Sequence, residues 1–367
     1  MLLPEARGPV TEQLQTLRSA DARVDVGRVS SAIDASTGQL LDSDDTQLAL
    51  WLLYELHYQG FDDVDPHAEW SPDVLTVRGG LEKRFEAELR ELTHRTVQHG
   101  LRTAGGIADR LFAMVRDDDS PRLAQYVQRE ITAERFRELL VHRSVYTLKE
   151  ADPHTWAIPR LRGRAKAALT EIQFDEYGSG RADDMHSAIF ARTMTRCGLD
   201  GTYGAYVDAV PGYTLAVNNA MSLFGLHRRL RGAAAGHLAA LEASSTLPNR
   251  RYAAGVRRLG YGDEAARYFD EHVEADAVHE QVAVREMCGA VVADEPDLEA
   301  DVLFGAATCL ALDGLAAGRL LDSWRGGHSA LLRPVVDSPH SGLEAVLPSA
   351  VVLTKRAGLP LREKASG

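Results

Sequence analysis

Two histidines and an aspartate recur on one face of a predicted helix in the last third of the chain. In the segment YFDEHVEADAVHEQVA, His272, Asp276 and His279 follow one another at intervals of four and three residues. At about 100° per residue they form one narrow stripe, shared with the apolar Phe269 and Met287. Burying such groups unpaired is unfavourable, and a metal ion satisfies all three. A solvated polar face or a hydrogen-bond network is the alternative interpretation.

A second carboxylate and a third histidine flank a glycine-rich break. The apolar stripe of a helix predicted over residues 160–176 runs directly into Glu176. Beyond Gly178-Ser179-Gly180, a helix predicted over residues 182–197 carries His186 on its apolar face. Each residue alone is also explained as a hydrogen-bonded core group. Together they bring a glutamate and a histidine to one junction.

A third carboxylate, Glu150, is aligned with Phe136 and Tyr146 on the preceding predicted helix. An ion pair with Arg143, which shares that stripe, is the alternative explanation. With Glu150 the candidates number three carboxylates and three histidines. This is the ligand inventory expected of a carboxylate-bridged pair of irons with open positions for dioxygen.

The residues above resemble the heme-oxygenase-like di-iron oxidases and oxygenases, also described as iron-containing redox enzymes. In that family one helix provides a Glu, a second provides a Glu followed ten positions later by a His, and a third provides His-x3-Asp-x2-His. The resemblance covers roughly residues 141–324. It implies two irons that cycle between Fe(II) and Fe(III), O2 as co-substrate, and, with Glu176 bridging, the metal ligands Glu150, Glu176, His186, His272, Asp276 and His279.

The resemblance also implies an O2-activating monooxygenase or oxidase. We favour N-oxygenation of an amino or guanidino compound in specialised biosynthesis. Oxidative decarboxylation and C–C cleavage on the same di-iron site are the alternatives, because the ligand set does not distinguish them. No catalytic residue beyond the metal ligands is predicted. No nucleotide cofactor is predicted either, since Gly178-Ser179-Gly180 lacks the third glycine and the preceding strand of a dinucleotide fingerprint.

Three other interpretations start from different features. A heme-binding protein of the heme oxygenase type is suggested by Gly232-Ala-Ala-Ala-Gly236 and His237, although close helix packing explains this motif equally. A ferritin-like site is suggested by Glu91-Leu-Thr-His94, which lies on a highly charged helix. A helical protein that binds partners without catalysis is the third. No role is assigned to a further set of polar residues on core helices: Arg162, Arg164, His227, Arg228 and Glu242.

The periodicity predicts an all-α fold, a heme-oxygenase-like helical bundle with an N-terminal helical extension. We expect the extension over residues 1–120, the di-iron domain over 121–335 and a tail over 336–367. Residues 1–40 are expected to be irregular and 61–80 to form a long connection. Strand-like alternation is confined to residues 331–336 and 350–353. Helical patterns cover residues 46–58, 81–100, 104–116, 121–150, 160–176, 182–197, 212–243, 262–289 and 296–324.

Composition narrows the class of partner. The 367 residues are 45% hydrophobic with a net charge of −12, which argues against nucleic acid and anionic membranes. With no apolar run at the N-terminus, a cytoplasmic location is expected. The expected partner is a small-molecule substrate, and an external electron donor and a homodimer are compatible with it. Three widely spaced cysteines are expected to be small core residues: Cys197, Cys288 and Cys309.

Overall fold

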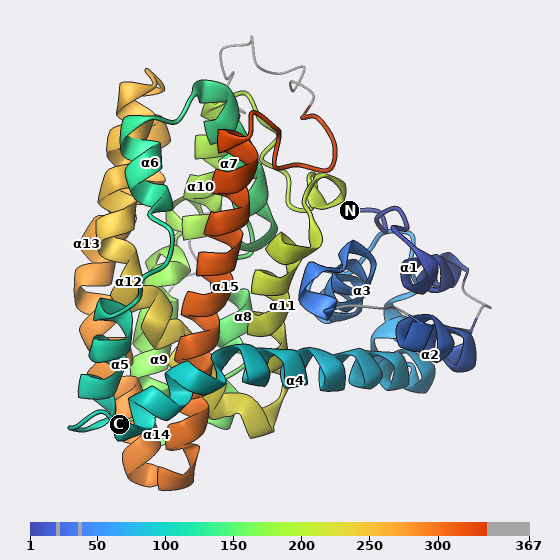
Figure 1. Ribbon diagram of the computed structural model, residues 1–367, viewed down its shortest axis with the longest axis horizontal. Helices are drawn as coiled ribbons and strands as arrows, with labels where there is room; N and C mark the ends of the chain where they lie inside the picture. Colours follow the sequence, from blue (N-terminus) through green and yellow to red (C-terminus); the bar gives the residue numbers. More distant parts are fainter. Residues whose placement is uncertain (20–22, 36–38, 336–367) are drawn as a thin grey trace, which may run out of the picture.

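The fold is all-α, as predicted. The computed structural model describes residues 1–19, 23–35 and 39–335, and these contain helices and no strand (Figure 1). Within α13 the side chains of residues 276 and 277 are also outside the described part. The three cysteines are buried and unpaired, as expected of core residues.

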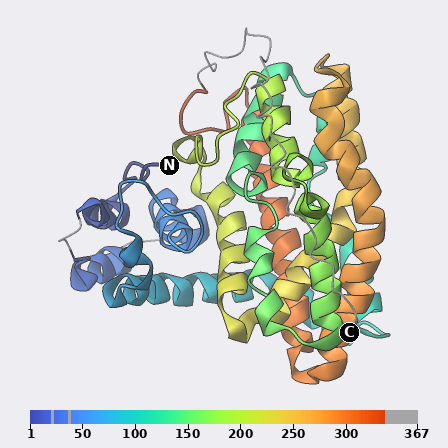
Figure 2. The ribbon, with the colours of Figure 1, turned by 180° about the vertical axis from the view of Figure 1, so that it is seen from behind.

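The main body is a bundle of long helices that run side by side in both views (Figures 1 and 2). At its centre α12 (Arg231–Arg258) packs against both α13 (Gly262–Gln281) and α15 (Glu299–Arg325). The remaining helices of the body are α5 (Ile107–Arg116), α6 (Leu123–Arg129), α7 (Ala133–Thr147), α8 (Asp152–Thr155), α9 (Gly163–Glu176), α10 (His186–Arg196), α11 (Gly212–Leu226) and α14 (Gly289–Asp294).

Glycines bring α12 and α15 into backbone contact. A Cβ added to Gly236 would lie 1.8 Å from the carbonyl oxygen of Val302, and one added to Gly305 would lie 1.9 Å from that of Ala233. Only glycine permits this approach. The motif that ends at Gly236 therefore serves close helix packing, the interpretation weighed against heme binding. By length and composition, Pro296–Arg325 is also apolar enough to cross a membrane, but 61% of its most apolar window is buried, as in a core helix.

The N-terminal helices form a layer beside the bundle. In Figure 1, α4 (Pro72–Arg102) crosses below α1 (Pro9–Leu14), α2 (Val26–Ala35) and α3 (Asp44–Glu55) and reaches the bundle. There α4 packs on α15, and α3 packs on α11. The boundary near residue 120 stays a prediction.

Several sequence-based boundaries were wrong. The residues before 40 include α1 and α2, and α4 begins at Pro72 rather than near residue 81, because proline is well tolerated in the first turn of a helix. The patterns over 121–150 and 212–243 each divide into two helices. No strand forms in the described residues 331–335. Residues 350–353 lie outside the described part.

Candidate metal centre

Glu150 is held by an unusual turn after α7. The next residue, Ala151, has a φ of 76°, in the left-handed region that residues other than glycine rarely adopt. The carbonyl of Ala151 accepts a hydrogen bond from Gln173 Nε2 at 2.8 Å, which anchors the turn to α9. Strain of this kind persists only where surrounding contacts hold it, and it is frequent at functional sites. The turn reverses the chain directly beside the Glu150 carboxylate.

A tight loop sets the ten-residue interval between Glu176 and His186. Glu176 is the last residue of α9, and His186 is the first of α10. Between them Gly178 has a φ of 67°, and a Cβ at this position would lie 2.5 Å from the backbone of Asp184 and Met185. The loop can fold back on itself only because Gly178 has no side chain. His186 Nδ1 consequently lies 2.8 Å from Glu176 Oε2.

The third segment places two histidines on the buried face of α13. His272 and His279 are two helical turns apart and are 7% and 2% exposed. Phe269 and Met287 on the same stripe are fully buried, as the periodicity predicted. Directly after α13, residues Val282–Cys288 form a π-helix, a distortion that often occurs at functional sites.

These side chains form two groups that share one carboxylate. In the first group, one ligand atom from each residue lies within 4.8 Å of the others, and its members are Glu150, Glu176, His186 and His272. In the second, the same limit holds for Glu176, Glu242 and His279. Since Glu176 belongs to both groups, it is placed as a bridging carboxylate between two metal ions would be.

Tyr268 orients the first group. Its hydroxyl donates to the two carboxylate oxygens of Glu150 at 2.8 and 3.0 Å, and its carbonyl accepts from His272 Nδ1 at 2.8 Å. With Nδ1 held in this way, His272 Nε2 faces Glu150 Oε1 at 3.6 Å. Fixing the outer nitrogen in this way is the usual arrangement of metal-binding histidines. Burial alone would raise the pKa of Glu150, but His272 and His186 lower it below its usual range.

In the second group, raised pKa values favour protons on side chains that would have to lose them to bind a metal. His279 Nδ1 lies 3.7 Å from Glu176 Oε1 and 3.6 Å from Glu242 Oε2, while its Nε2 contacts Asp175 Oδ2 at 3.2 Å. Burial lowers the pKa of His279, but Glu242 and Asp175 outweigh this and raise it to about 9. Burial also raises the pKa of Glu242; His279 opposes that shift, and Glu176 adds to it. Metal binding would displace these protons.

Two orphaned nitrogen atoms test whether the residues suit a metal. His186 Nδ1 and His279 Nδ1 are buried and make no hydrogen bond, although carboxylate oxygens lie close to both. Buried nitrogen atoms normally find a partner. Imidazole and carboxylate together are the donors that iron accepts in non-heme sites. The cluster therefore fits a pair of metal ions.

The structure brings together five of the six predicted ligands. The exception is Asp276, whose side chain lies outside the described residues. Glu150 faces this cluster and not Arg143: no ion pair joins those two in the described part of the chain. The rival ferritin-like pair, Glu91 and His94, is exposed on α4. The assignment of the clustered residues as ligands stays a prediction.

Glu242 is the member that sequence reasoning missed. It is 4% exposed and was given no role. A signal was present, because Glu242 is the sole acid between Arg231 and Arg250, in a run of small and apolar residues. Such isolation on a buried helix indicates a carboxylate with a specific partner.

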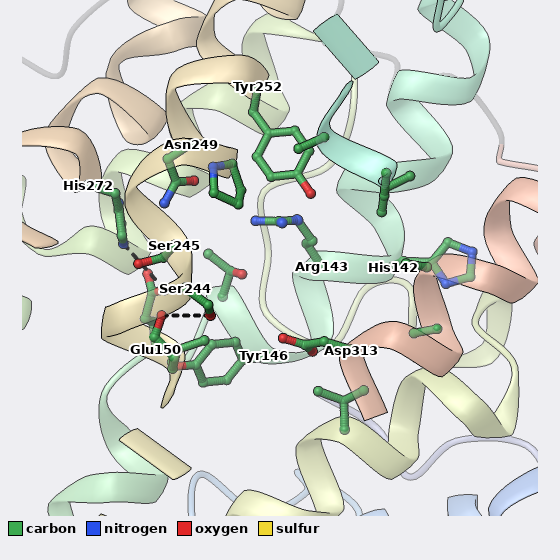
Figure 3. Close-up of a pocket in the computed structure, with 18 of the residues that line it drawn as sticks. His142, Arg143, Tyr146, Glu150, Ser244, Ser245, Asn249, Tyr252, His272 and Asp313 are labelled. Carbon is green, nitrogen blue, oxygen red and sulfur yellow. Dashed lines mark hydrogen bonds and ion pairs between the residues drawn. The ribbon is translucent and has the colours of Figure 1, made fainter. Parts of the chain in front are cut away.

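A cavity of about 380 Å³ leads to the cluster, and Figure 3 shows part of its lining. Glu150, Glu176, Glu242 and His272 form one part of the wall. Such a volume suits a small organic molecule. Away from the cluster, apolar side chains make up much of the lining, and the polar residues among them are His142, Arg143, Tyr146, Asn218, Ser244, Ser245, Asn249, Tyr252 and Asp313.

Comparisons with known proteins agree with this geometry. Residues 137–314 match the family described as iron-containing redox enzymes, and this span contains every residue of the cluster. A segment of 137 residues, 37% of the chain, is 31% identical to the nitrosourea synthase of Streptomyces achromogenes subsp. streptozoticus. The matched segment spans 29% of that relative's length.

Proposed function

We propose that this chain is a non-heme di-iron oxygenase that oxidises nitrogen in a small amino or guanidino compound, because residues 137–314 match the family described as iron-containing redox enzymes. The observation that carries the proposal is the pair of histidine and carboxylate groups that share Glu176 at the wall of a cavity. We place the enzyme in the cytoplasm, in a specialised biosynthetic pathway.

Each part of the cluster has a distinct task in this proposal. Bound iron supplies electrons and open coordination positions for dioxygen. Glu176 holds the two metal positions at a fixed separation. Tyr268 keeps Glu150 and His272 in place through its hydroxyl and its carbonyl. Asp175 accepts from His279 Nε2 and so leaves Nδ1 directed at the cluster.

The choice of nitrogen oxidation has two supports. A nitrosourea synthase, by its name, makes a product with an oxidised nitrogen atom, and part of this chain is similar to such an enzyme. The cavity lining also includes charged and amide side chains, which can pair with the polar groups of an amino or guanidino compound.

The electron balance requires a further partner. When one atom of O2 is inserted into an N–H bond to give N–OH, the other atom becomes water. That second step consumes two electrons and two protons. An external electron donor is therefore part of the proposal.

The test begins with metal content. Anaerobic protein is titrated with Fe(II), then given O2 and candidate amines, and products are identified by mass spectrometry. Two irons per chain and products that retain all carbons and gain one oxygen on nitrogen are expected. Loss of CO2 would instead identify a decarboxylase, and fragments would identify C–C cleavage. A Soret band with added hemin and no uptake of Fe(II) would contradict the di-iron assignment.

A further inference from the structure

Arg143 and Asp313 carry opposite charges into the same cavity without pairing with each other. Arg143 comes from α7 and Asp313 from α15, and both line the cavity in Figure 3. Each feels the charge of the other, yet no described carboxylate lies within ion-pair distance of Arg143. A guanidinium and a carboxylate separated in this way can each bind a charged group of a ligand placed between them.

The guanidinium is held in place from one side only. Its Cζ lies 4.5 Å from the ring centroid of Tyr252, a cation–π contact that orients its plane. Tyr252 is itself 5% exposed and packs against Phe269 of α13. Such a rigid, oriented fork suits recognition of a carboxylate, to which it can donate two parallel hydrogen bonds.

The Asp313 carboxylate lines the cavity and is accessible to solvent there. Burial raises the pKa of Asp313 to about 6; Arg143 on α7 opposes this shift, and Asp118, from the segment before α6, adds to it. The cavity segment around Asp118 also packs on α15, where a Cβ at Gly314 would lie 2.4 Å from Ser120 Oγ. Two acids at this part of the wall favour a positively charged group of the ligand.

Unpartnered polar atoms nearby also indicate a ligand. Both side-chain polar atoms of Asn218 lack a hydrogen-bond partner, although this residue is 1% exposed and lines the cavity. His142 Nε2 is likewise buried and unpaired. Pro248 in α12 has no N–H, so the carbonyl of Ser244 lacks its usual helical donor beside the same cavity. Buried polar groups of this kind normally acquire partners.

We propose that the cavity binds an α-amino acid, with its carboxylate on Arg143, its α-ammonium group on Asp313 and its side-chain nitrogen extended toward Glu150. Arg143 and Glu150 are seven residues apart, which is about 10 Å if the helical rise of α7 is extended over the turn that follows it. This separation suits a side chain of several methylene groups that ends in an amino or guanidino nitrogen. The inference rests on the proposed function and names its substrate class.

The test uses binding to iron-free protein, measured by calorimetry, with two matched sets of ligands. L-lysine is compared with cadaverine, which lacks the carboxylate, and with 6-aminohexanoate, which lacks the α-amino group. L-arginine is compared in the same way with agmatine and 5-guanidinopentanoate. At least one parent amino acid should bind about tenfold tighter than both of its analogues, because each analogue leaves one charged protein group unpaired.

Substitutions of Arg143 and Asp313 test which group of the ligand each residue binds. Arg143→Gln should weaken binding of the parent and of its carboxylate-bearing analogue by about ten- to a hundredfold and leave cadaverine or agmatine unchanged. Asp313→Asn should weaken the parent and the amine-bearing analogue and leave the carboxylate analogue unchanged. Arg143→Lys should restore part of the lost affinity, and Arg164→Gln, at an exposed arginine outside the cavity, should change nothing.

The inference is overturned if neither parent binds tighter than its analogues, if both variants weaken every ligand equally, or if decanoate binds best. The wild-type order of affinities tests it even where a variant does not fold. Selective binding without Fe(II) uptake or oxygen consumption would refute the proposed function and leave this site standing. Oxidation of an amine that lacks both the α-carboxylate and the α-ammonium group, with no preference for the amino acid, would refute this site and leave the proposed function standing.

Discussion

Replacing Glu242 by glutamine separates a metal ligand from a residue that merely pairs with His279. The change preserves shape and removes one charge. At an effective dielectric constant of about 20, the 3.6 Å contact with His279 is worth about 4.6 kcal/mol of attraction. Glu176, whose ligand oxygen lies within 4.8 Å, repels the same charge by about 3.5 kcal/mol or more.

The small surplus of attraction is less than the desolvation penalty of a buried carboxylate, which is several kcal/mol. The charge on Glu242 therefore destabilises the iron-free protein, in agreement with its raised pKa. We expect Glu242→Gln to leave the iron-free melting temperature unchanged or to raise it by about one to two degrees. His279 keeps Asp175 and Glu176 as partners.

In the iron-loaded protein the effect of Glu242→Gln on stability should have the opposite sign. Loss of a ligand should weaken Fe(II) binding at one of the two positions by about a hundredfold, which removes about 2.7 kcal/mol of ligand-linked stabilisation at saturating metal. Anaerobic calorimetry with and without Fe(II) measures both effects in one protein. A colorimetric iron assay after gel filtration should find one tightly held iron per variant chain, compared with two in the wild type.

Glu138 supplies the matched control. It is also a buried glutamate, 8% exposed, but it accepts from Trp324 Nε1 at 2.8 Å and from the backbone N–H of Ala330 at 2.9 Å. Glu138→Gln should lower the iron-free melting temperature and leave the increment from Fe(II) intact. If Glu242→Gln behaves in the same way as this control, Glu242 is a structural partner of His279 and the second group is not a metal position.

Three further perturbations test neighbouring parts of the structure. Tyr268→Phe removes both hydrogen bonds to Glu150 and should weaken Fe(II) affinity by about ten- to a hundredfold, with circular dichroism unchanged; equal affinity would refute the orienting role. Asp313 must be ionised to bind an ammonium group, and its pKa is about 6. Lowering the pH from 7.5 to 5 should therefore protonate Asp313 and reduce the affinity for agmatine about tenfold, while the affinity for 5-guanidinopentanoate stays constant. An equal loss of affinity for both ligands would contradict this. Lys149→Met removes the cationic partner of the buried Glu55 and should lower the free energy of unfolding in urea by about 3–5 kcal/mol. The double variant with Glu55→Gln should recover part of that loss.

The helical bundle and the buried stripe of candidate ligands on α13 follow from local patterns. The stripe of α13 is visible because polar residues interrupt an otherwise apolar face, and both His272 and His279 are buried on it. The apolar stripes brought Glu176 and His186 to one junction, but their direct contact depends on the close backbone approach at Gly178, which no periodicity reveals. Glu150 had a competing partner in Arg143 until the turn at Ala151 was known.

Other features depend on packing between distant segments. The sequence around Ser244 and Pro248 disfavours a helix, and the predicted helix ends near residue 243. In the structure, however, α12 continues to Arg258. Packing overrides local preference here, because a Cβ at Gly255 would lie 2.7 Å from the carbonyl oxygen of Val127 in α6, and Val256 is fully buried. That continuation also places Asn249 and Tyr252 beside the cavity.

The two groups of candidate ligands differ in how well the protein orients them for a metal. Tyr268 fixes Glu150 and His272 from inside the core, where it packs on Phe190 with ring centroids 5.0 Å apart. The second position depends on His279, whose outer partner Asp175 is 48% exposed and therefore well hydrated. Its ligands also hold protons that a metal must displace, whereas the pKa of Glu150 is already lowered. If the two groups hold metal ions as proposed, the first would be prepared before a metal arrives, and the second would be completed only when a cation replaces those protons.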